Sequence, residues 1–376
     1  MATLNNPFVT YGYKGSEYFC DRERETRDII NALHNERSIT LVAPRRMGKT
    51  GLIHHVFNQI EKTQPDVRCF YVDIYPTKNL QQMVKAMARV ILGKLDSPTQ
   101  NAMRKITQLF SRFRPTVTYD EITGIPTVSL DIAENEERIS LEQIFEYMRV
   151  SGTRCYVAID EFQQILSYSD QGVEALFRSY IQFLPNVYFI FAGSQHHVIE
   201  QMFASANRPF FQSTQMIHLA PLDESKYRKF ANTFFDRQGR QISTKVFHEL
   251  YTTMRGVTWY VHAVLNRIYQ EQSKPITQRL VNQIVDQLTE EQVPVFQNIY
   301  HALTENQAKL ATAIAREGIV AKPLASDFIT RNRLPSPSSV QSALNKLVAN
   351  QLVFSSGQGY CVYDYFMAQW LKQLSS

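Results

Sequence analysis

The stretch from residue 38 to residue 53 constrains the fold more than any other part of the chain. It reads SITLVAPRRMGKTGLI, which is an apolar strand, a loop that ends in Gly-Lys-Thr, and the start of an amphipathic helix. The backbone N–H groups of such a loop, together with the N-terminus of the following helix, form a site for anions. We therefore predict a nucleotide-binding loop made of Ala43, Pro44, Arg45, Arg46, Met47, Gly48, Lys49, Thr50 and Gly51.

The chemistry of phosphate binding gives individual residues of this loop distinct roles. Lys49 can reach the β- and γ-phosphates of ATP, and the Thr50 hydroxyl can ligate Mg²⁺. Gly48 lets the backbone approach a phosphate closely. The motif usually begins with Gly, where this chain has Ala43; we treat it as a variant that the loop accommodates if φ stays negative, although it leaves the hydrolysis rate open. The alternative interpretation is a chance Gly-Lys-Thr in an unrelated loop.

A second chemical signature follows the apolar run Cys155–Ile159, which ends in Asp160-Glu161. Two carboxylates at the end of a buried strand are costly unless a cation or a reaction requires them. Asp160 is predicted to ligate Mg²⁺, directly or through water, and Glu161 to orient or deprotonate the attacking water. The alternative is an ordinary helix N-cap, a position that Asp favours.

The first two-thirds of the chain alternates short apolar strands with amphipathic helices. We predict strands at Ile39–Val42, Cys69–Ile74, Cys155–Ile159, Val187–Ala192 and Met216–Leu219. The helical patterns between them include Gly51–Glu61, Leu80–Leu95, Leu141–Val150 and Gly172–Phe183. Such alternation indicates an α/β fold with a parallel sheet covered on both faces.

The chain is expected to form three domains. An ATPase domain spans 1–221 and carries a β-hairpin insertion at about 115–131, with a turn at Gly124. The basic and aromatic stretch Arg104–Arg114 precedes this hairpin and is interpreted as a solvated helix face. A helical lid spans 222–293. Residues 294–376 read as a winged helix: helices near Glu305–Glu317, Ala325–Thr330 and Ser338–Asn350, then strands at Leu352–Ser355 and Tyr360–Val362.

Composition favours a reduced, cytoplasmic protein with no membrane partner. No apolar run reaches the roughly 18 residues of a transmembrane helix, and the N-terminal residues lack the pattern of a secretory signal. The four cysteines lie far apart, without a C-x-x-C pair. The net charge of +5 permits an acidic partner but does not identify one.

Six segments, in the same order, resemble the archaeal-type ATPases that are grouped with the AAA+ superfamily and lie close to the STAND class. They are YFCDRERE, APRRMGKT, AIDEFQQI, FRSYIQFL, YFIFAGSQHHVIEQMF and ANRPFFQSTQMIHLAPLD. The resemblance covers about residues 6–270. It implies the P-loop sheet with a catalytic glutamate, a helical lid and, in most members, a C-terminal winged helix.

The resemblance also implies roles for single residues. Ser194 corresponds to a polar sensor at the end of a strand. Arg208 matches an arginine that acts on the γ-phosphate, in cis or from a neighbouring subunit; the alternative is a structural ion pair. Phe8 and Phe19 belong to a stretch that packs on the adenine, and the alternative there is aromatic core packing. The lid of relatives carries G-x-P, whereas this chain has Gly256-Val257-Thr258.

Other polar groups are not assigned to a site. His54-His55 and His196-His197 are adjacent pairs, and neighbours along a helix point about 100° apart, so neither pair chelates a metal by itself. The metal we expect is the Mg²⁺ of the nucleotide. In residues 294–376, seven Lys/Arg stand against four Asp/Glu, which is a weak footprint for DNA. Contact with duplex DNA and a protein-docking role, including self-association, both remain open for the winged helix.

Three functional hypotheses follow. The leading one is a slowly hydrolysing ATPase that acts as a molecular switch, in which ATP or ADP controls the arrangement of lid and winged helix. The second is an ATP-dependent, initiator-like regulator that binds duplex DNA through residues 294–376. The third is a scaffold with a structural nucleotide.

Overall fold

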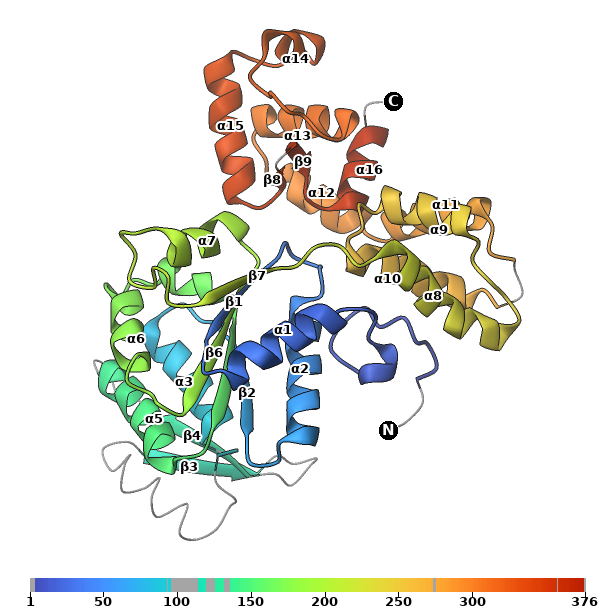
Figure 1. Cartoon of the computed structure of the whole chain (residues 1–376). Helices are drawn as coiled ribbons and strands as arrows, with labels where there is room; N and C mark the ends of the chain where they lie inside the picture. The colour runs from blue at the N-terminus through green and yellow to red at the C-terminus, as the bar shows by residue number, and fades with distance from the viewer. Residues whose placement is uncertain are drawn as a thin grey trace. The chain divides into compact units, whose positions relative to one another are not determined.

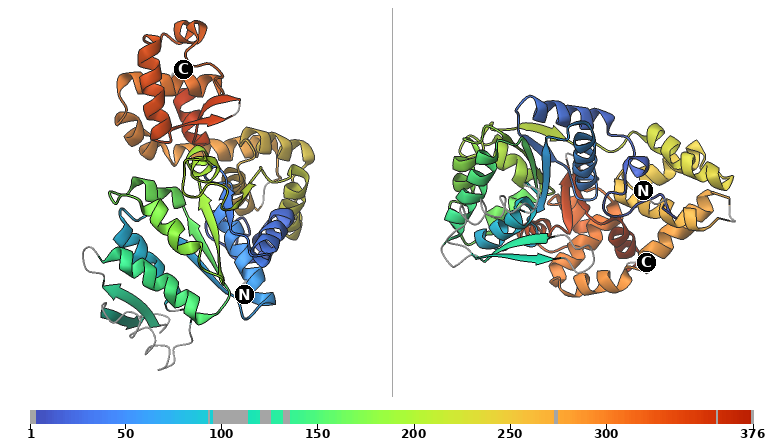
Figure 2. Two further views of the ribbon diagram at one scale, coloured as in Figure 1. Left: turned by 60° about the vertical axis from the view of Figure 1, so that its left-hand side comes forward. Right: turned by 90° about the horizontal axis from the view of Figure 1, so that it is seen from below.

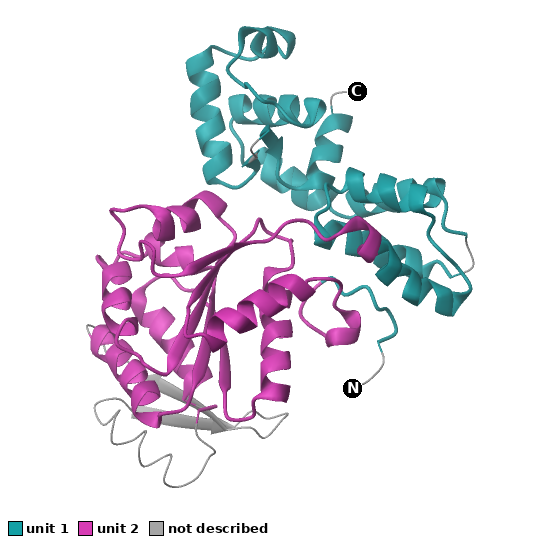
Figure 3. Cartoon of the chain, viewed as in Figure 1, with its two compact units in different colours: residues 1–10, 228–376 teal, residues 11–227 magenta. Residues whose placement is uncertain are grey.

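A computed structural model describes residues 4–92, 94–95, 114–119, 126–131, 136–272, 275–356 and 358–374. The chain forms two compact units (Figure 3): unit 2 is residues 11–227, and unit 1 is residues 1–10 together with 228–376. The three-domain division stays a prediction; by contacts, the lid and winged-helix regions belong to one unit. The Gly124 turn and nearly all of the stretch Arg104–Arg114 lie outside the described residues.

Unit 2 is built on a five-stranded parallel sheet with the order β2-β5-β6-β1-β7. Its strands are β1 (Ile39–Val42), β2 (Arg68–Asp73), β5 (Cys155–Asp160), β6 (Val187–Gly193) and β7 (Gln215–His218). Every residue of β1, β5 and β6 is buried, as expected for strands with helices on both faces. The structure confirms the predicted α/β class and shifts the predicted strand ends by one residue at most.

Helices cover both faces of this sheet (Figure 1). On one face lie α1 (Glu23–His34) and α2 (Lys49–Thr63). The other face carries α3 (Leu80–Ile91), α5 (Glu137–Ser151), α6 (Val173–Ile181) and α7 (His196–Ala204), whose apolar residues share one core cluster with β2, β5 and β6. The 3-10 helices are η1 (Ser16–Tyr18) and η2 (Phe162–Ser167). Strands β3 (Arg114–Tyr119) and β4 (Pro126–Asp131) pair antiparallel, which is the predicted hairpin.

The register of the sheet brings the carboxyl ends of its five strands to one edge. Val42 pairs with Gly193 on one side and with His218 on the other, and Asp73 pairs with Asp160. Because all five strands are parallel, the residues that follow their carboxyl ends gather there. This edge is where open α/β sheets bind their ligands.

The lid region of unit 1 is helical, as predicted. It contains α8 (Glu224–Phe235, whose first residues belong to unit 2), η3 (Asp236–Gln238), α9 (Thr244–Thr253), α10 (Thr258–Gln270) and α11 (Gln278–Glu290). Phe8 is completely buried among aromatic rings of this region, and the side chain of Asn6 donates a hydrogen bond to the carbonyl of Asn266. The start of the chain is therefore part of the lid core.

The C-terminal part of unit 1 is a winged helix. It consists of α12 (Val293–His301), α13 (Glu305–Glu317), α14 (Ser326–Arg331), α15 (Pro337–Ala349), the wing strands β8 (Val353–Ser356) and β9 (Gly359–Val362), and α16 (Tyr365–Gln373). Figure 2 shows the winged helix from two further sides. The wing strands β8 and β9 contact α13, α15 and α16. The sequence interpretation did not include α16, whose Phe366 and Leu371 are completely buried.

Lid and winged helix are joined by specific contacts. The Arg255 guanidinium donates to the carbonyl of Val362 at 3.0 Å, and the backbone N–H of Tyr365 donates to the Tyr260 hydroxyl at 3.2 Å. The rings of Tyr260 and Phe366 meet edge to face, with centroids 5.4 Å apart. These contacts explain why the two regions form one compact unit.

No described helix has the length and apolar character needed to cross a membrane.

Candidate functional site

The phosphate loop connects β1 to α2 at the carboxyl edge of the sheet. Arg46 and Gly48 have φ values of +69° and +90°, so the loop folds back before α2 begins at Lys49. The left-handed conformation at Gly48 favours glycine, which explains that residue at the N-cap. Ala43 is buried and does not adopt a positive φ. This is the backbone condition under which the loop was expected to accommodate alanine in place of glycine.

Lys49 and Thr50, at the start of α2, face the two carboxylates at the end of β5. The Thr50 hydroxyl donates to Oδ2 of Asp160 at 2.7 Å. The ammonium of Lys49 lies 3.4 Å from Oε1 of Glu161 and 3.9 Å from Oδ1 of Asp160. The side chains of Lys49 and Asp160 are each less than a tenth exposed. Residues 110 positions apart therefore form one charged cluster, in which Lys49 and Asp160 are buried and Thr50 and Glu161 are partly buried.

Glu161 is held in place from three sides. Its Oε2 accepts hydrogen bonds from the Ser194 hydroxyl at 2.7 Å, from the Ser194 backbone N–H at 3.3 Å and from the Gln163 amide. Burial alone would raise the pKa of Glu161, but the charge of Lys49 and these hydrogen bonds lower it below its usual value. Glu161 also has φ +56°, a strained conformation for a residue with a side chain. The site thus holds an ionised carboxylate in a fixed orientation.

Two further residues of the cluster, Tyr71 and Gln163, were not found from the sequence. The Tyr71 hydroxyl, on β2, donates to Oδ2 of Asp160 at 2.8 Å. Gln163 is buried beside Gly193, where an added Cβ would collide with its amide oxygen. Arg45, which was predicted as part of the nucleotide-binding loop, donates to the Ser194 hydroxyl at 3.4 Å. Tyr71 lies inside an apolar strand pattern, which gave no signal of its polar role.

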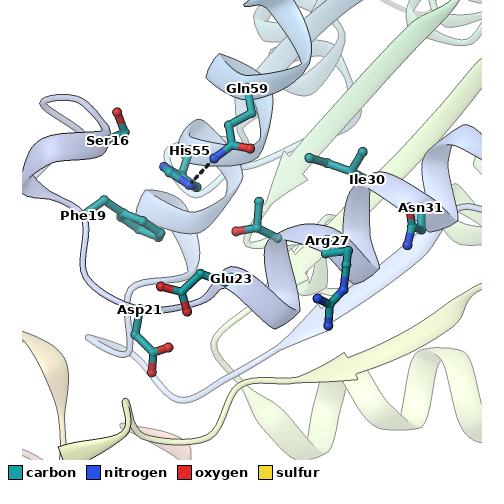
Figure 4. A pocket seen from close by; sticks show the side chains of 10 residues that line it. Ser16, Phe19, Asp21, Glu23, Arg27, Ile30, Asn31, His55 and Gln59 are labelled. Atoms are coloured by element: carbon teal, nitrogen blue, oxygen red, sulfur yellow. Dashed lines mark hydrogen bonds between the residues drawn. The ribbon is translucent and has the colours of Figure 1, made fainter. Parts of the chain in front are cut away.

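A cavity of about 520 Å³ lies beside the same loop, between η1, α1 and α2 (Figure 4). Phe19 lines it and stacks on His55, with ring centroids 4.2 Å apart and planes 16° apart. Burial lowers the pKa of His55, and its two ring nitrogens contact the Tyr13 hydroxyl and the Gln59 amide. The other lining residues are Ser16, Asp21, Glu23, Thr26, Arg27, Ile30 and Asn31.

This cavity is tied to the phosphate loop. The Cβ of a residue larger than glycine at position 51 would contact Phe19 at 3.6 Å. Arg22 is buried, with one guanidinium nitrogen 2.8 Å from Glu25 and the other donating to the carbonyl of Met47 at 3.5 Å. The volume falls within the range of about 300–1,000 Å³ that is typical of small-molecule sites.

Two predicted site residues lie elsewhere. Phe8 is buried in the lid core against Phe234, Phe235 and other rings, so it has no exposed face for a base; the aromatic-core alternative describes its position. Arg208 forms an ion pair of 2.7 Å with the buried carboxylate of Glu174 on α6. That contact matches the alternative of a structural ion pair.

The donor set at the sheet edge fits a nucleotide with its magnesium ion. A helix N-terminus and the Lys49 ammonium suit phosphate oxygens, and the adjacent oxygens of Thr50 and Asp160 suit Mg²⁺, which prefers hard oxygen ligands. A parallel sheet of this strand order, with such a loop and an acidic strand end, is the architecture of a P-loop ATPase.

Comparison with known proteins agrees with this class. A family model described as an ATPase domain predominantly from Archaea matches residues 19–264, and a model described as a probable winged helix domain matches residues 294–373. The chain belongs to the family of ATPase domains found predominantly in Archaea. No curated protein sequence matches it significantly.

Solved structures show the same fold along nearly the whole chain. A Walker-type ATPase of Pyrococcus abyssi is similar at 18% identity and a TM-score of 0.66, covering 97% of this chain and 99% of that one. The ORC1 protein of Aeropyrum pernix, solved in complex with DNA, has 12% identity and a TM-score of 0.57, covering 98% and 96%. The ORC2 protein of the same organism, solved with ADPNP and ADP, has 13% identity, a TM-score of 0.51 and 99% coverage of both chains. At these identities the likeness shows the fold.

Proposed function

We propose that this protein binds ATP with Mg²⁺ and hydrolyses it slowly, and that the bound nucleotide controls the arrangement of its lid and winged helix. The observation that carries the proposal is the cluster of Lys49, Thr50, Asp160, Glu161 and Ser194, in which Lys49 and Asp160 are buried and the other three are partly buried. A cluster with this much buried charge is costly to fold and therefore marks a functional site. Membership of the ATPase family and the nucleotide complexes of a fold relative also support nucleotide binding.

The residues of the cluster divide the chemistry of hydrolysis among themselves. Thr50 and Asp160 would hold Mg²⁺, which neutralises charge on the β- and γ-phosphates when bound. Lys49 exchanges its contact with Glu161 for the phosphates, because phosphate oxygens carry more negative charge than one carboxylate. Glu161, kept in orientation by Ser194 and Gln163, then accepts a hydrogen bond from the attacking water. Removing the Glu161 charge should therefore stop turnover and preserve binding.

Phe19 is proposed to contact the adenine. The Phe19–His55 stack forms one wall of the cavity in Figure 4, and the contact of Phe19 with position 51 places this wall next to the first turn of α2. A purine can stack on such an aromatic surface. Phe8 is left out of this proposal because its ring is buried in the lid.

The switch hypothesis gains support from unit 1. Lid and winged helix are held together by the Arg255 and Tyr260 contacts, so a nucleotide that acts on the lid would act on both regions at once. A lid and winged helix that respond as one body are sufficient for a two-state device. Small-angle scattering with and without ATP tests this step: identical profiles in both states would contradict the switch.

The alternative is an ATP-dependent regulator that binds duplex DNA, and two observations favour it: the family model for a winged helix and the fold relative solved with DNA. The electrostatics are weaker. Arg331 lies 2.8 Å from Glu317, so this guanidinium is already paired before any phosphate approaches. Salt-dependent binding that disappears when Arg331, Arg333 and Lys346 are neutralised would favour this alternative.

The first experiment measures ATP binding and hydrolysis with and without duplex DNA for the wild type, Lys49→Ala and Glu161→Gln. Lys62→Ala, at an exposed position of the same helix α2, and Glu142→Gln, at an exposed position of α5, are matched controls. We expect Lys49→Ala to lose binding and Glu161→Gln to bind without turnover. Stimulation by DNA would select the DNA regulator, and indifference to DNA would select the switch with a protein partner. A wild type that binds no nucleotide would refute the proposal.

A further inference from the structure

Four metal-binding side chains gather at the carboxyl edge of the sheet, outside the nucleotide cluster. His196 and His197 open α7, Glu200 follows one turn later, and His218 is the last residue of β7. Spacings of three and four residues place His197, His196 and Glu200 on neighbouring positions of one helix surface. The adjacent histidines do not chelate by themselves, as the sequence indicated; Glu200 and His218 complete the group.

The distances are close to those of a metal site. His196 Nδ1 lies 3.1 Å from one oxygen of Glu200, and His218 Nδ1 lies 3.6 Å from the other. The ligand atoms of His196, His197 and Glu200 are all within 4.8 Å of one another. In tetrahedral zinc sites, bonds of about 2.0–2.2 Å separate neighbouring ligand atoms by roughly 3.2–3.6 Å. Small rotations would let His196, His197 and Glu200 share one ion, and His218 approaches this group through its 3.6 Å contact with Glu200.

The chemistry of the group selects the kind of ion. Imidazole nitrogens suit zinc, copper and nickel, whereas calcium and magnesium prefer oxygen ligands alone. His196 and Glu200 are about one-third exposed, which leaves access for the ion and for a water ligand.

We propose that His196, Glu200 and His218, with His197 as a fourth candidate ligand, bind a divalent transition-metal ion of the zinc class that fixes α7 to the end of β7. The site is separate from the nucleotide's magnesium: its ligands are mainly imidazoles with one carboxylate, and magnesium is a poor competitor for imidazole nitrogens. Because α7 begins two residues after Ser194, the ion fixes the segment that follows the sensor strand. The proposal does not depend on hydrolysis.

Metal uptake by the full chain tests this site directly. Tag-free protein is titrated with zinc in excess Mg²⁺ and ADP, so that hard-cation and nucleotide sites are occupied, and bound zinc is counted after desalting. The four cysteines are also potential zinc ligands, but all are buried, and burial raises the pKa of Cys20, Cys69, Cys155 and Cys361, which disfavours the thiolates that bind zinc. We expect one zinc ion per chain and a rise in melting temperature on zinc addition.

The variants decide which side chains hold the ion. Glu200→Gln and His218→Ala should each weaken zinc binding by about tenfold or more, since even outer partners of metal ligands are worth 10–100-fold in affinity. His34→Ala, an exposed histidine at the end of α1, should have no effect. Cobalt in place of zinc should give the visible absorption of a four-coordinate site, lost in the same two variants. Circular dichroism of the zinc-free variants checks their folding, and exposed His218 keeps the test valid if Glu200→Gln misfolds.

Two results would overturn the proposal. One is a wild type that binds no zinc under these conditions. The other is zinc uptake that persists unchanged in both Glu200→Gln and His218→Ala, because the ion would then be bound by other groups.

Discussion

The two compact units place their buried polar groups very differently. Among the described residues, the charged side chains that are buried lie in unit 2: Arg22, Lys49, Asp160 and Glu174. Unit 1 buries only His262 and Thr289 among polar residues that the structure describes, and its core is otherwise aromatic and aliphatic. Burying charge costs stability unless it serves binding or chemistry. The contrast therefore favours unit 2 as the place of the proposed chemistry, whereas unit 1 is held together mainly by apolar packing.

Phe8 and Phe19 test this contrast with the largest expected effect. Phe8→Ala removes a fully buried ring from the lid core and should lower the free energy of unfolding of unit 1 by about 3–5 kcal/mol. Phe19→Ala should leave unit 1 unchanged and weaken nucleotide binding by about tenfold, through the lost stacking surface.

Tryptophan fluorescence separates the two effects. The chain has two tryptophans, Trp259 and Trp370, and both belong to unit 1, so denaturant unfolding followed by their fluorescence reports that unit alone. Nucleotide titrations report unit 2. If Phe8→Ala weakened nucleotide binding while the tryptophan transition stayed in place, our assignment of Phe8 to the lid core would be incorrect.

His262 makes the stability of unit 1 depend on pH. Burial lowers its pKa to about 4, so the folded state resists protonation while the unfolded state accepts a proton near pH 6.5. Stability is therefore complete above the unfolded pKa and falls as the pH drops from about 6.5 towards 4. The full shift corresponds to roughly 3 kcal/mol.

The measurement compares wild type with His262→Gln, which keeps a polar side chain but does not titrate. Urea unfolding followed by tryptophan fluorescence at pH 7 and pH 4.5 should show a clearly smaller loss for the variant. Other titrating groups are common to both proteins and cancel in the difference. Equal losses would mean that His262 does not control the acid sensitivity of unit 1.

Local sequence patterns were sufficient to predict much of the secondary structure. The boundaries predicted for β1 and α13 are those of the structure. A short apolar strand and a capped amphipathic helix are both determined by residues that are neighbours in the sequence. The two motifs also assigned Thr50 and Asp160 to the same Mg²⁺, and the parallel sheet brings these two side chains into contact.

The missing parts depend on contacts between residues far apart in sequence. Phe8 and Phe19 look alike locally, yet one packs in the lid core and the other lines a cavity. Tyr71 reaches Asp160 only because β2 pairs with β5 in a register that local sequence does not encode. His218 joins Glu200 through the same kind of long-range placement. Side-chain partners of this type require the assembled sheet.

Ser194 sharpens the chemical half of the comparison. Its hydroxyl donates to Oε2 of Glu161, and a hydrogen bond to a charged group is worth about 1.5–3 kcal/mol. Ser194→Ala should therefore slow ATP turnover by about tenfold or more with little change in ATP affinity. Ser194→Thr keeps the hydroxyl and should recover part of the rate. Single-turnover kinetics separates the hydrolysis step from binding; an unchanged rate in Ser194→Ala would remove Ser194 from the mechanism.

Arg208 carries the smallest expected effect and decides between two roles by magnitude. Its ion pair with Glu174 joins a partly exposed guanidinium to a buried carboxylate, whose pKa is raised by burial against the lowering effect of Arg208. If the pair is structural, Arg208→Met and Glu174→Gln each destabilise unit 2, and the double variant shows a coupling of about 0.5–3 kcal/mol. Hydrogen exchange of peptides from α6 measures this loss within unit 2.

If Arg208 instead acts on the γ-phosphate, Arg208→Met would lower turnover by about 10³–10⁵-fold, and Glu174→Gln would have no effect. We expect turnover to stay within about threefold of wild type in Arg208→Met, because the guanidinium is committed to Glu174 and the described cluster around Glu161 is completed by Ser194 and Gln163.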